Sequence, residues 1–250
     1  MGTAGCQPDG RAKVDKWLAR VWRALCPPAC VLCGADAERI DLCAGCEADL
    51  PRCEPVCARC AAPVAGIAAS IECGRCQRRP PPFDRAICAF DYAFPVDRLL
   101  QALKFRGALV YGRVLGELLA ARIAAAALAL PGVIVPMPLH RSRLGERGFN
   151  QACEIARPVS RRLGLPVDTG GVFRARATLE QTHLNARERR TNLRGAFTAR
   201  RKDWPGHVAI IDDVLTTGST AGELASTLKK AGVRQVDVWC VARTFHGANV

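Results

Sequence analysis

The residues best suited to chemistry lie together near the carboxyl end of this 250-residue chain. An apolar run at 207–211 leads into two adjacent carboxylates, Asp212 and Asp213. A hydroxyl-rich turn follows and opens a helix; its residues are Thr216, Thr217, Gly218, Ser219 and Thr220. Free N–H groups at a helix N-terminus attract phosphate, and glycine lets the backbone approach a ligand closely. We therefore expect the turn to hold a 5′-phosphate and the carboxylates to accept hydrogen bonds from the vicinal hydroxyls of a ribose.

A second segment, residues 135–151, supplies positive charge after a predicted short strand at 133–135. Guanidinium groups bind pyrophosphate through paired, charge-assisted hydrogen bonds, so an arginine-rich loop at a strand end predicts a pyrophosphate site. The residues that we expect to bind there are Pro138, Arg141, Arg143 and Arg147. His140 lies in the same loop and is either a proton-transfer group or a simple hydrogen-bonding residue.

A third segment, residues 181–197, is polar and basic. Enzymes that bind phosphorylated substrates often close a loop over them to exclude water. We expect this segment to form such a mobile cover.

The amino-terminal third carries different chemistry, because eleven of the 14 cysteines precede residue 77. Eight of them form four Cys-x-x-Cys pairs: Cys30 and Cys33, Cys43 and Cys46, Cys57 and Cys60, Cys73 and Cys76. Two such pairs complete a tetrahedral thiolate site, so we predict two structural zinc ions with no open position for a catalytic water. Free thiols or redox disulfides are the alternative. Sequential grouping of the pairs is simplest, although a cross-braced grouping fits the same spacing. Cys26 and Cys53 have no partner at ligand spacing.

Beyond residue 80, strands alternate with helices, which predicts an α/β domain with a mostly parallel sheet covered on both faces. We expect strands at 87–92, 133–135, 207–211 and 236–241, and helices at 96–104, 109–130, 150–163 and 220–231. Pro158 should kink the third helix, and Gly232 should follow the last one. The predicted organisation is a leader with a short amphipathic helix at 1–25, a cysteine module at 26–80 and the α/β domain at 81–250.

Charge is uneven along the chain, whose net charge is +13. Residues 81–250 hold 25 basic and 14 acidic residues, and the excess is densest between 140 and 202. Such a field attracts phosphorylated metabolites or nucleic acid, and a merely solubilising surface is the alternative. Aromatic residues make up only 6%, so backbone contacts should dominate any binding of single-stranded DNA. No apolar stretch reaches the ~20 residues of a membrane span, and no signal peptide is recognisable, so we expect a cytoplasmic protein.

Taken together, these segments resemble the ComF family, also described as competence-protein-F or amidophosphoribosyltransferase-like proteins. The specific parts are the motif at 208–220, which is similar to the 5-phosphoribosyl-1-pyrophosphate (PRPP) motif of type I phosphoribosyltransferases, the Arg-Gly-Phe-Asn-Gln run at 147–151, and the segment at 181–197. The resemblance covers the chain from about residue 20 onward. It implies a double zinc ribbon before a type I phosphoribosyltransferase fold. It also implies PRPP with Mg²⁺ as ligand, and a role in the uptake of single-stranded DNA with that DNA and a competence helicase as partners.

The resemblance leaves two main hypotheses and a weaker third. In an enzyme, Asp212 and Asp213 would hold the ribose, and Arg147 with its neighbours would stabilise the departing pyrophosphate. In a non-catalytic module, the same pocket would sense PRPP or a nucleotide while the ribbons and basic face hold single-stranded DNA. A nucleobase-salvage transferase is the third. The leader, Cys26, Cys53 and Pro158 depart from the family pattern and make the zinc grouping less secure.

Overall fold

The computed structural model describes residues 28–37, 40–52, 54–64, 72–176 and 195–244. The chain divides into two compact units, residues 1–49 and 50–250. The first four paired cysteines belong to the first unit, and the second four share a unit with the α/β domain. The predicted leader, the amphipathic helix and the two extra cysteines, Cys26 and Cys53, lie outside the described residues.

The first unit is built around its cysteines. Isolated β-bridges join Ala29 to Asp36 and Ile40 to Leu42, and they shape the turns that carry the thiols. Helix α2 (Ala44–Ala48) begins after Cys43, whose thiol accepts the N–H of Cys46 at 3.5 Å. This five-residue helix buries none of its residues, so packing contributes little to its stability.

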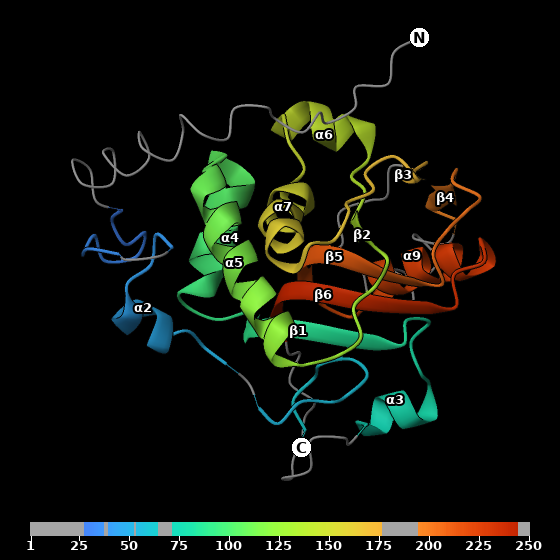
Figure 1. Ribbon diagram of the computed structural model, residues 1–250, viewed down its shortest axis with the longest axis horizontal. Helices are drawn as coiled ribbons and strands as arrows, with labels where there is room; N and C mark the ends of the chain where they lie inside the picture. Colours follow the sequence, from blue (N-terminus) through green and yellow to red (C-terminus); the bar gives the residue numbers. More distant parts are fainter. Residues whose placement is uncertain (1–27, 38–39, 53, 65–71, 177–194, 245–250) are drawn as a thin grey trace. The chain divides into compact units, whose positions relative to one another are not determined.

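The second unit is organised around a four-stranded parallel sheet in the order β1-β6-β5-β2 (Figure 1). Its strands are β1 (Arg85–Asp91), β2 (Val133–Pro136), β5 (His207–Leu215) and β6 (Gln235–Arg243). Their Val- and Ile-rich centres are buried, as parallel strands covered on both faces require. The predicted parallel α/β class is confirmed. The prediction that β5 ends at Ile211 is wrong, because β6 pairs with it as far as Leu215.

Helices cover both faces of this sheet. Helices α5 (Leu109–Ala125) and α7 (Gln151–Leu163) pack on one face, with α4 (Val96–Arg106) against α5 (Figure 1). Helix α9 (Ser219–Lys230) packs on the strands through a different apolar cluster, which includes Val208 and Ile210. All four predicted helices are confirmed, and Gly232 follows α9 with a left-handed φ of 100°.

Two details of the α5–α7 pair differ from expectation. Helix α5 ends at Ala125 rather than near residue 130, because Ala127 takes a positive φ of 49° that no helix continues through. Helix α7 runs through Pro158 without ending. A Cβ on Gly116 of α5 would lie 2.3 Å from the Pro158 ring, so glycine is what permits this close approach.

Four short elements of the second unit were not predicted. Residues 141–147, expected as a loop, form helix α6 (Arg141–Arg147), which His140 caps at its start and Gly148 closes with a φ of 74°. Strands β3 (Val172–Arg174) and β4 (Phe197–Ala199) form a separate antiparallel pair. Helix α3 (Gly74–Arg78) begins directly after Cys73 and contains Cys76. Of the predicted cover, only residues 195–197 are described. Within the described part of the chain, none of the helices could cross a membrane.

Candidate functional site

The carboxylate pair lies where β5 extends past the neighbouring strand β2. Strand β2 stops at Pro136, opposite Ile211, whereas β6 continues beside β5 to its end. Asp212 and Asp213 therefore lie at the carboxyl edge of the sheet, where ligands of parallel α/β domains bind. Successive side chains of a strand point to opposite faces, so the two carboxylates have different surroundings.

Asp213 is buried and is paired with a lysine that sequence reasoning missed. Its Oδ2 lies 2.6 Å from the Nζ of Lys104 on α4, and its Oδ1 accepts the N–H of Val214 at 2.7 Å. Burial alone would lower the pKa of Lys104, but the charge of Asp213 outweighs it and raises that pKa. Asp213 and Lys104 therefore form an ion pair at the edge of the site. The sequence does contain a signal for Lys104, because this lysine lies between Leu103 and Phe105 on a helix that faces the core.

Asp212 has arginines for neighbours. Burial, followed by the negative charge of Asp213, raises its pKa well above the ordinary value. Burial and the positive charge of Arg143 lower the pKa of Arg174, whereas Asp212 raises it. Arg174 of β3 therefore interacts electrostatically with both Asp212 of β5 and Arg143 of α6. Sequence reasoning missed Arg174, because a three-residue strand carries no recognisable pattern.

The hydroxyl-rich turn joins β5 to α9. Gly218 has a φ of 78°, and a Cβ there would lie 3.4 Å from the ring of buried Phe83, so both backbone and space favour glycine. The hydroxyls of Thr217 and Ser219 lie 2.8 Å apart, and Ser219 donates its N–H to Thr217 at 3.3 Å. All five residues predicted for phosphate binding, from Thr216 to Thr220, are partly exposed and lie at one place.

The three predicted arginines all lie on α6. Arg143 and Arg147 are four residues apart and share one side of the helix, and Arg147 lies 5.8 Å from the ring centre of Phe105. Arg141 is exposed at the start of α6 and falls on a different side.

The backbone that leads into α6 is fixed beside β5. Met137 donates its N–H to Ile211 at 2.8 Å, and Asn150 donates its side-chain amide to the Met137 carbonyl at 3.0 Å. Pro138 follows directly and is half-buried. His140 accepts the N–H of Ser142 at 3.3 Å, so the contacts of this histidine are those of a helix cap.

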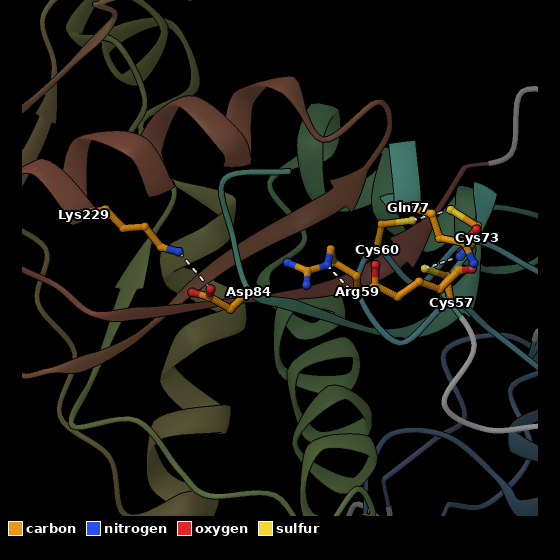
Figure 2. Close-up of polar contacts among 8 residues, drawn as sticks. Cys57, Arg59, Cys60, Cys73, Gln77, Asp84 and Lys229 are labelled. Carbon is orange, nitrogen blue, oxygen red and sulfur yellow. Dashed lines mark hydrogen bonds and ion pairs between the residues drawn. The ribbon is translucent and has the colours of Figure 1, made fainter. Parts of the chain in front are cut away.

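The paired cysteines form two tetrads grouped in sequence order. The first tetrad is Cys30, Cys33, Cys43 and Cys46, and the second is Cys57, Cys60, Cys73 and Cys76. Within each tetrad the four sulfur atoms lie within 4.8 Å of one another, and all eight are free thiols. Tetrahedral zinc with Zn–S bonds of about 2.3 Å needs such a cluster, so the donors fit structural zinc. Figure 2 shows three sulfurs of the second tetrad converging.

Backbone donors favour the thiolates that zinc requires. Burial opposes ionisation of Cys30 and Cys57, but backbone N–H groups outweigh it, first those of Cys43 and Cys73 in the facing pairs and then those of their own turns. They lower the pKa of Cys30 to about 6 and that of Cys57 to about 7. In the same tetrads the pKa of Cys46 is raised, mainly by Cys33 and Cys43, and that of Cys76 is raised by burial and by Cys60. One ion per tetrad would remove this repulsion between thiolates.

Two cysteine tetrads precede a parallel α/β domain that carries a carboxylate pair and a hydroxyl-rich turn at one strand end, so the chain has the architecture of a double zinc ribbon followed by an α/β domain with a candidate ligand site. The model of the double zinc ribbon domain family matches residues 21–77. DNA utilization protein YhgH of Salmonella typhimurium is 37% identical over 92% of this chain and 96% of its own length. Competence protein F of Haemophilus influenzae is 35% identical over 81% of this chain and 90% of its own. The chain belongs to the family of these proteins, the ComF family.

Two solved structures are similar over about half of the chain. The glutamine PRPP amidotransferase of B. subtilis, complexed with ADP and GMP, has a TM-score of 0.35 and 20% identity, and covers 51% of this chain and 25% of its own. A hypoxanthine phosphoribosyltransferase from Staphylococcus aureus has a TM-score of 0.32 and 16% identity, and covers 54% and 72%. Similarity at this level says nothing about the ligand of this chain.

Proposed function

We propose that this protein binds PRPP with Mg²⁺ at the carboxyl edge of its sheet and acts in the uptake or processing of single-stranded DNA. One observation carries the proposal of PRPP binding. Asp212 lies near the end of β5, which leads directly into the hydroxyl-rich turn at the start of α9, and its negative charge acts on Arg174 of β3, which also feels the charge of Arg143. A sugar with a phosphate at one end and a pyrophosphate at the other matches this order of groups.

Each part of the site has one task in this proposal. The hydroxyls of Thr217 and Ser219, which contact each other at 2.8 Å, would turn to the 5′-phosphate. Asp212 would accept the ribose hydroxyls, and Lys104 would hold Asp213 in place as the second carboxylate. Arg143, Arg147 and Arg174, with Arg141 at the rim, would hold the pyrophosphate.

Transfer would need no protein nucleophile. Mg²⁺ bound with the pyrophosphate would neutralise charge as the C1–O bond breaks. The arginines of α6 and β3 would stabilise the charge that develops on the leaving group, which is electrostatic catalysis. The two carboxylates would hold the ribose so that an incoming nitrogen meets C1.

Calorimetric titration of zinc-loaded protein with PRPP and Mg²⁺ tests the pocket. We expect saturable binding that is lost in Asp212→Asn/Asp213→Asn and retained in Asp203→Asn, whose side chain is 86% exposed outside the site. Binding that survives in the double variant would remove the carboxylate pair from the site. If folded wild type does not bind PRPP, the motif has no PRPP-binding function in this protein.

Turnover separates an enzyme from a sensor. If the protein is a phosphoribosyltransferase, some acceptor base will release pyrophosphate from bound PRPP, and Arg147→Gln will slow that step more than it weakens binding. A sensor would bind PRPP or a nucleotide and release none with any base. A salvage transferase would accept a free purine or pyrimidine.

Binding of single-stranded DNA is the second part of the proposal, and the names of the relatives and the basic charge support it. The described residues also contain four arginine–phenylalanine pairs that the low aromatic content did not suggest; in one of them Arg52 lies 5.9 Å from the ring centre of buried Phe90. Arg200 lies 4.1 Å from the ring centre of Phe173, Arg174 lies 5.7 Å from that of Phe197, and Arg147 lies 5.8 Å from that of Phe105. A pair whose ring is exposed, such as Arg147 with Phe105, can add base stacking to backbone contacts, whereas the ring of Phe197 is buried.

Fluorescence anisotropy with oligo(dT) and a mixed-sequence strand tests this part. Affinity should fall steeply between low and high salt and depend little on sequence. Arg200→Gln should weaken binding, whereas Arg157→Gln, on the exposed side of α7, should not. Equal affinity across salt concentrations would contradict phosphate-backbone binding. The competence helicase partner and the cytoplasmic location remain predictions.

A further inference from the structure

One buried arginine contacts both the second zinc tetrad and the phosphate turn. Arg243 ends β6 and is 5% exposed. Its Nε donates to the carbonyl of Cys60 at 3.1 Å. Its Nη1 donates to the carbonyls of Leu215 at 2.7 Å, of Thr244 at 2.9 Å, and of Thr216. A single guanidinium therefore joins the backbone of a zinc ligand to the first residues of the turn.

Other contacts join the same two regions. Arg75 lies between Cys73 and Cys76 on α3 and reaches the carbonyl of Thr217 at 3.4 Å. Phe83, which packs under Gly218, belongs to the same apolar cluster as three cysteines of the second tetrad.

The segment that follows the ribbon is anchored as well. Asp84 lies 2.9 Å from Lys229 of α9 (Figure 2), and it accepts the N–H of Val236 at 2.8 Å. The second ribbon is thus fixed to both ends of the helix whose start holds the turn.

The energetic consequence follows from the burial of Arg243. A buried guanidinium must have its donors satisfied, and here the acceptors are backbone carbonyls of two different segments. Those carbonyls reach it only when the turn around Cys60 and the turn after β5 both keep the shapes seen here. The conformation of each turn therefore stabilises that of the other. The positive charge of Arg243 also lies behind the phosphate turn, which is suited to an anion.

We propose that Arg243 couples the second zinc site to the phosphate turn, so that zinc at the second tetrad and a phosphorylated ligand at Thr216–Thr220 each raise the affinity for the other. The identity of that ligand rests on the function proposed above, whereas the effect of zinc on the turn does not. Coupling between two binding sites is reciprocal, so it can be measured from either end.

Hydrogen exchange measures the coupling without any ligand. Exchange of the amides in 214–221 should become about tenfold faster when Cys73→Ser/Cys76→Ser removes the second zinc. The matched variant Cys43→Ser/Cys46→Ser loses the other zinc and should leave these amides as in wild type. Equal exchange in both variants and wild type would overturn the proposal.

Variants that keep both tetrads avoid the risk of a failed fold. Arg243→Gln and the milder Arg243→Lys should retain two zinc ions per chain, yet release the second one faster to a chelator. With wild type, PRPP and Mg²⁺ should slow that release about fivefold or more, and the slowing should disappear in Arg243→Gln. Arg75→Gln should reduce it, and Arg157→Gln should leave it unchanged.

The outcomes separate the two proposals. If wild type binds no PRPP, the proposed function fails, and the exchange of residues 214–221 still decides the coupling. If PRPP binds but Arg243→Gln has the zinc release, exchange and affinity of wild type, the coupling fails and the function stands.

Discussion

The two cysteine tetrads have the same ligands and similar spacing but different surroundings. In the first, Cys30 is buried, but Cys33 is exposed, Cys43 and Cys46 are half-buried, and helix α2 buries none of its residues. In the second, Cys57, Cys60 and Cys76 are at most 2% exposed and belong to the apolar cluster that supports the sheet and α9. The first tetrad forms a ribbon that depends on its metal, whereas the second is also part of a domain core.

This difference shows what a metal-ligand motif specifies. A Cys-x-x-Cys turn fixes the geometry of two sulfurs and predicts the ion, but it says nothing about what packs around it. The same motif can therefore hold a small module together at one place and position a ligand-binding turn at another. In this chain the second ribbon makes that link through Arg243.

The largest expected effect comes from replacing one pair of cysteines in the second tetrad, compared with a separate variant that replaces one pair in the first tetrad. Cys57→Ser/Cys60→Ser should lower the melting temperature of the main transition by on the order of 10 °C, because the core loses both metal and packing. Cys30→Ser/Cys33→Ser should leave that transition within about 2 °C. Scanning calorimetry with measured zinc content checks both. Similar losses in the two variants would show that the tetrads do not differ in this way.

A smaller effect is expected for the ion pair between Asp213 and Lys104 of α4. Lys104→Met leaves Asp213 buried without its cation and should cost about 1–3 kcal/mol, less than a fully buried pair because the lysine side chain is 24% exposed. Urea unfolding measures the loss. Adding Asp213→Asn should recover most of it, and zinc release from either tetrad should not change. Additive losses in the double variant would mean that the two side chains do not act as a pair.

Sequence reasoning predicted which residues lie together where they are close in sequence, and the ligand-binding roles of the carboxylates and the turn stay predictions. The carboxylates, the turn and all eight paired cysteines are contiguous patterns, and the structure brings each set together. It missed Lys104, Arg174 and Arg243, since each acts through a partner distant in sequence, such as Cys60 for Arg243. Helix α6 and the β3–β4 pair were missed for another reason, because three to seven residues are too few to show a hydrophobic period.

We expect Asp212, at the candidate site, to lower the stability of the folded protein, in contrast to the residues of the ribbons. Its pKa is raised in the folded state, so the charged carboxylate costs stability at neutral pH and the cost disappears as pH falls through that pKa. Asp212→Asn should therefore stabilise the protein by about 0.5–2 kcal/mol at pH 7–8. The gain should shrink on acidification and vanish near the ordinary pKa of about 3.9. Denaturant unfolding as a function of pH measures it, and a gain that grows on acidification would contradict the assignment.

The smallest effect should come from the exposed ion pair of the second ribbon. Arg59 lies between Cys57 and Cys60, and its Nε lies 2.8 Å from Glu72, just before Cys73 (Figure 2). Both side chains are about one-third exposed, at 30% and 33%, so Arg59→Gln should cost less than about 1 kcal/mol, and less still in 1 M salt. Zinc release should change little, in contrast to Arg243→Gln. If Arg59→Gln instead released the second zinc as fast as Arg243→Gln, surface charge rather than the buried arginine would set the difference between the two tetrads.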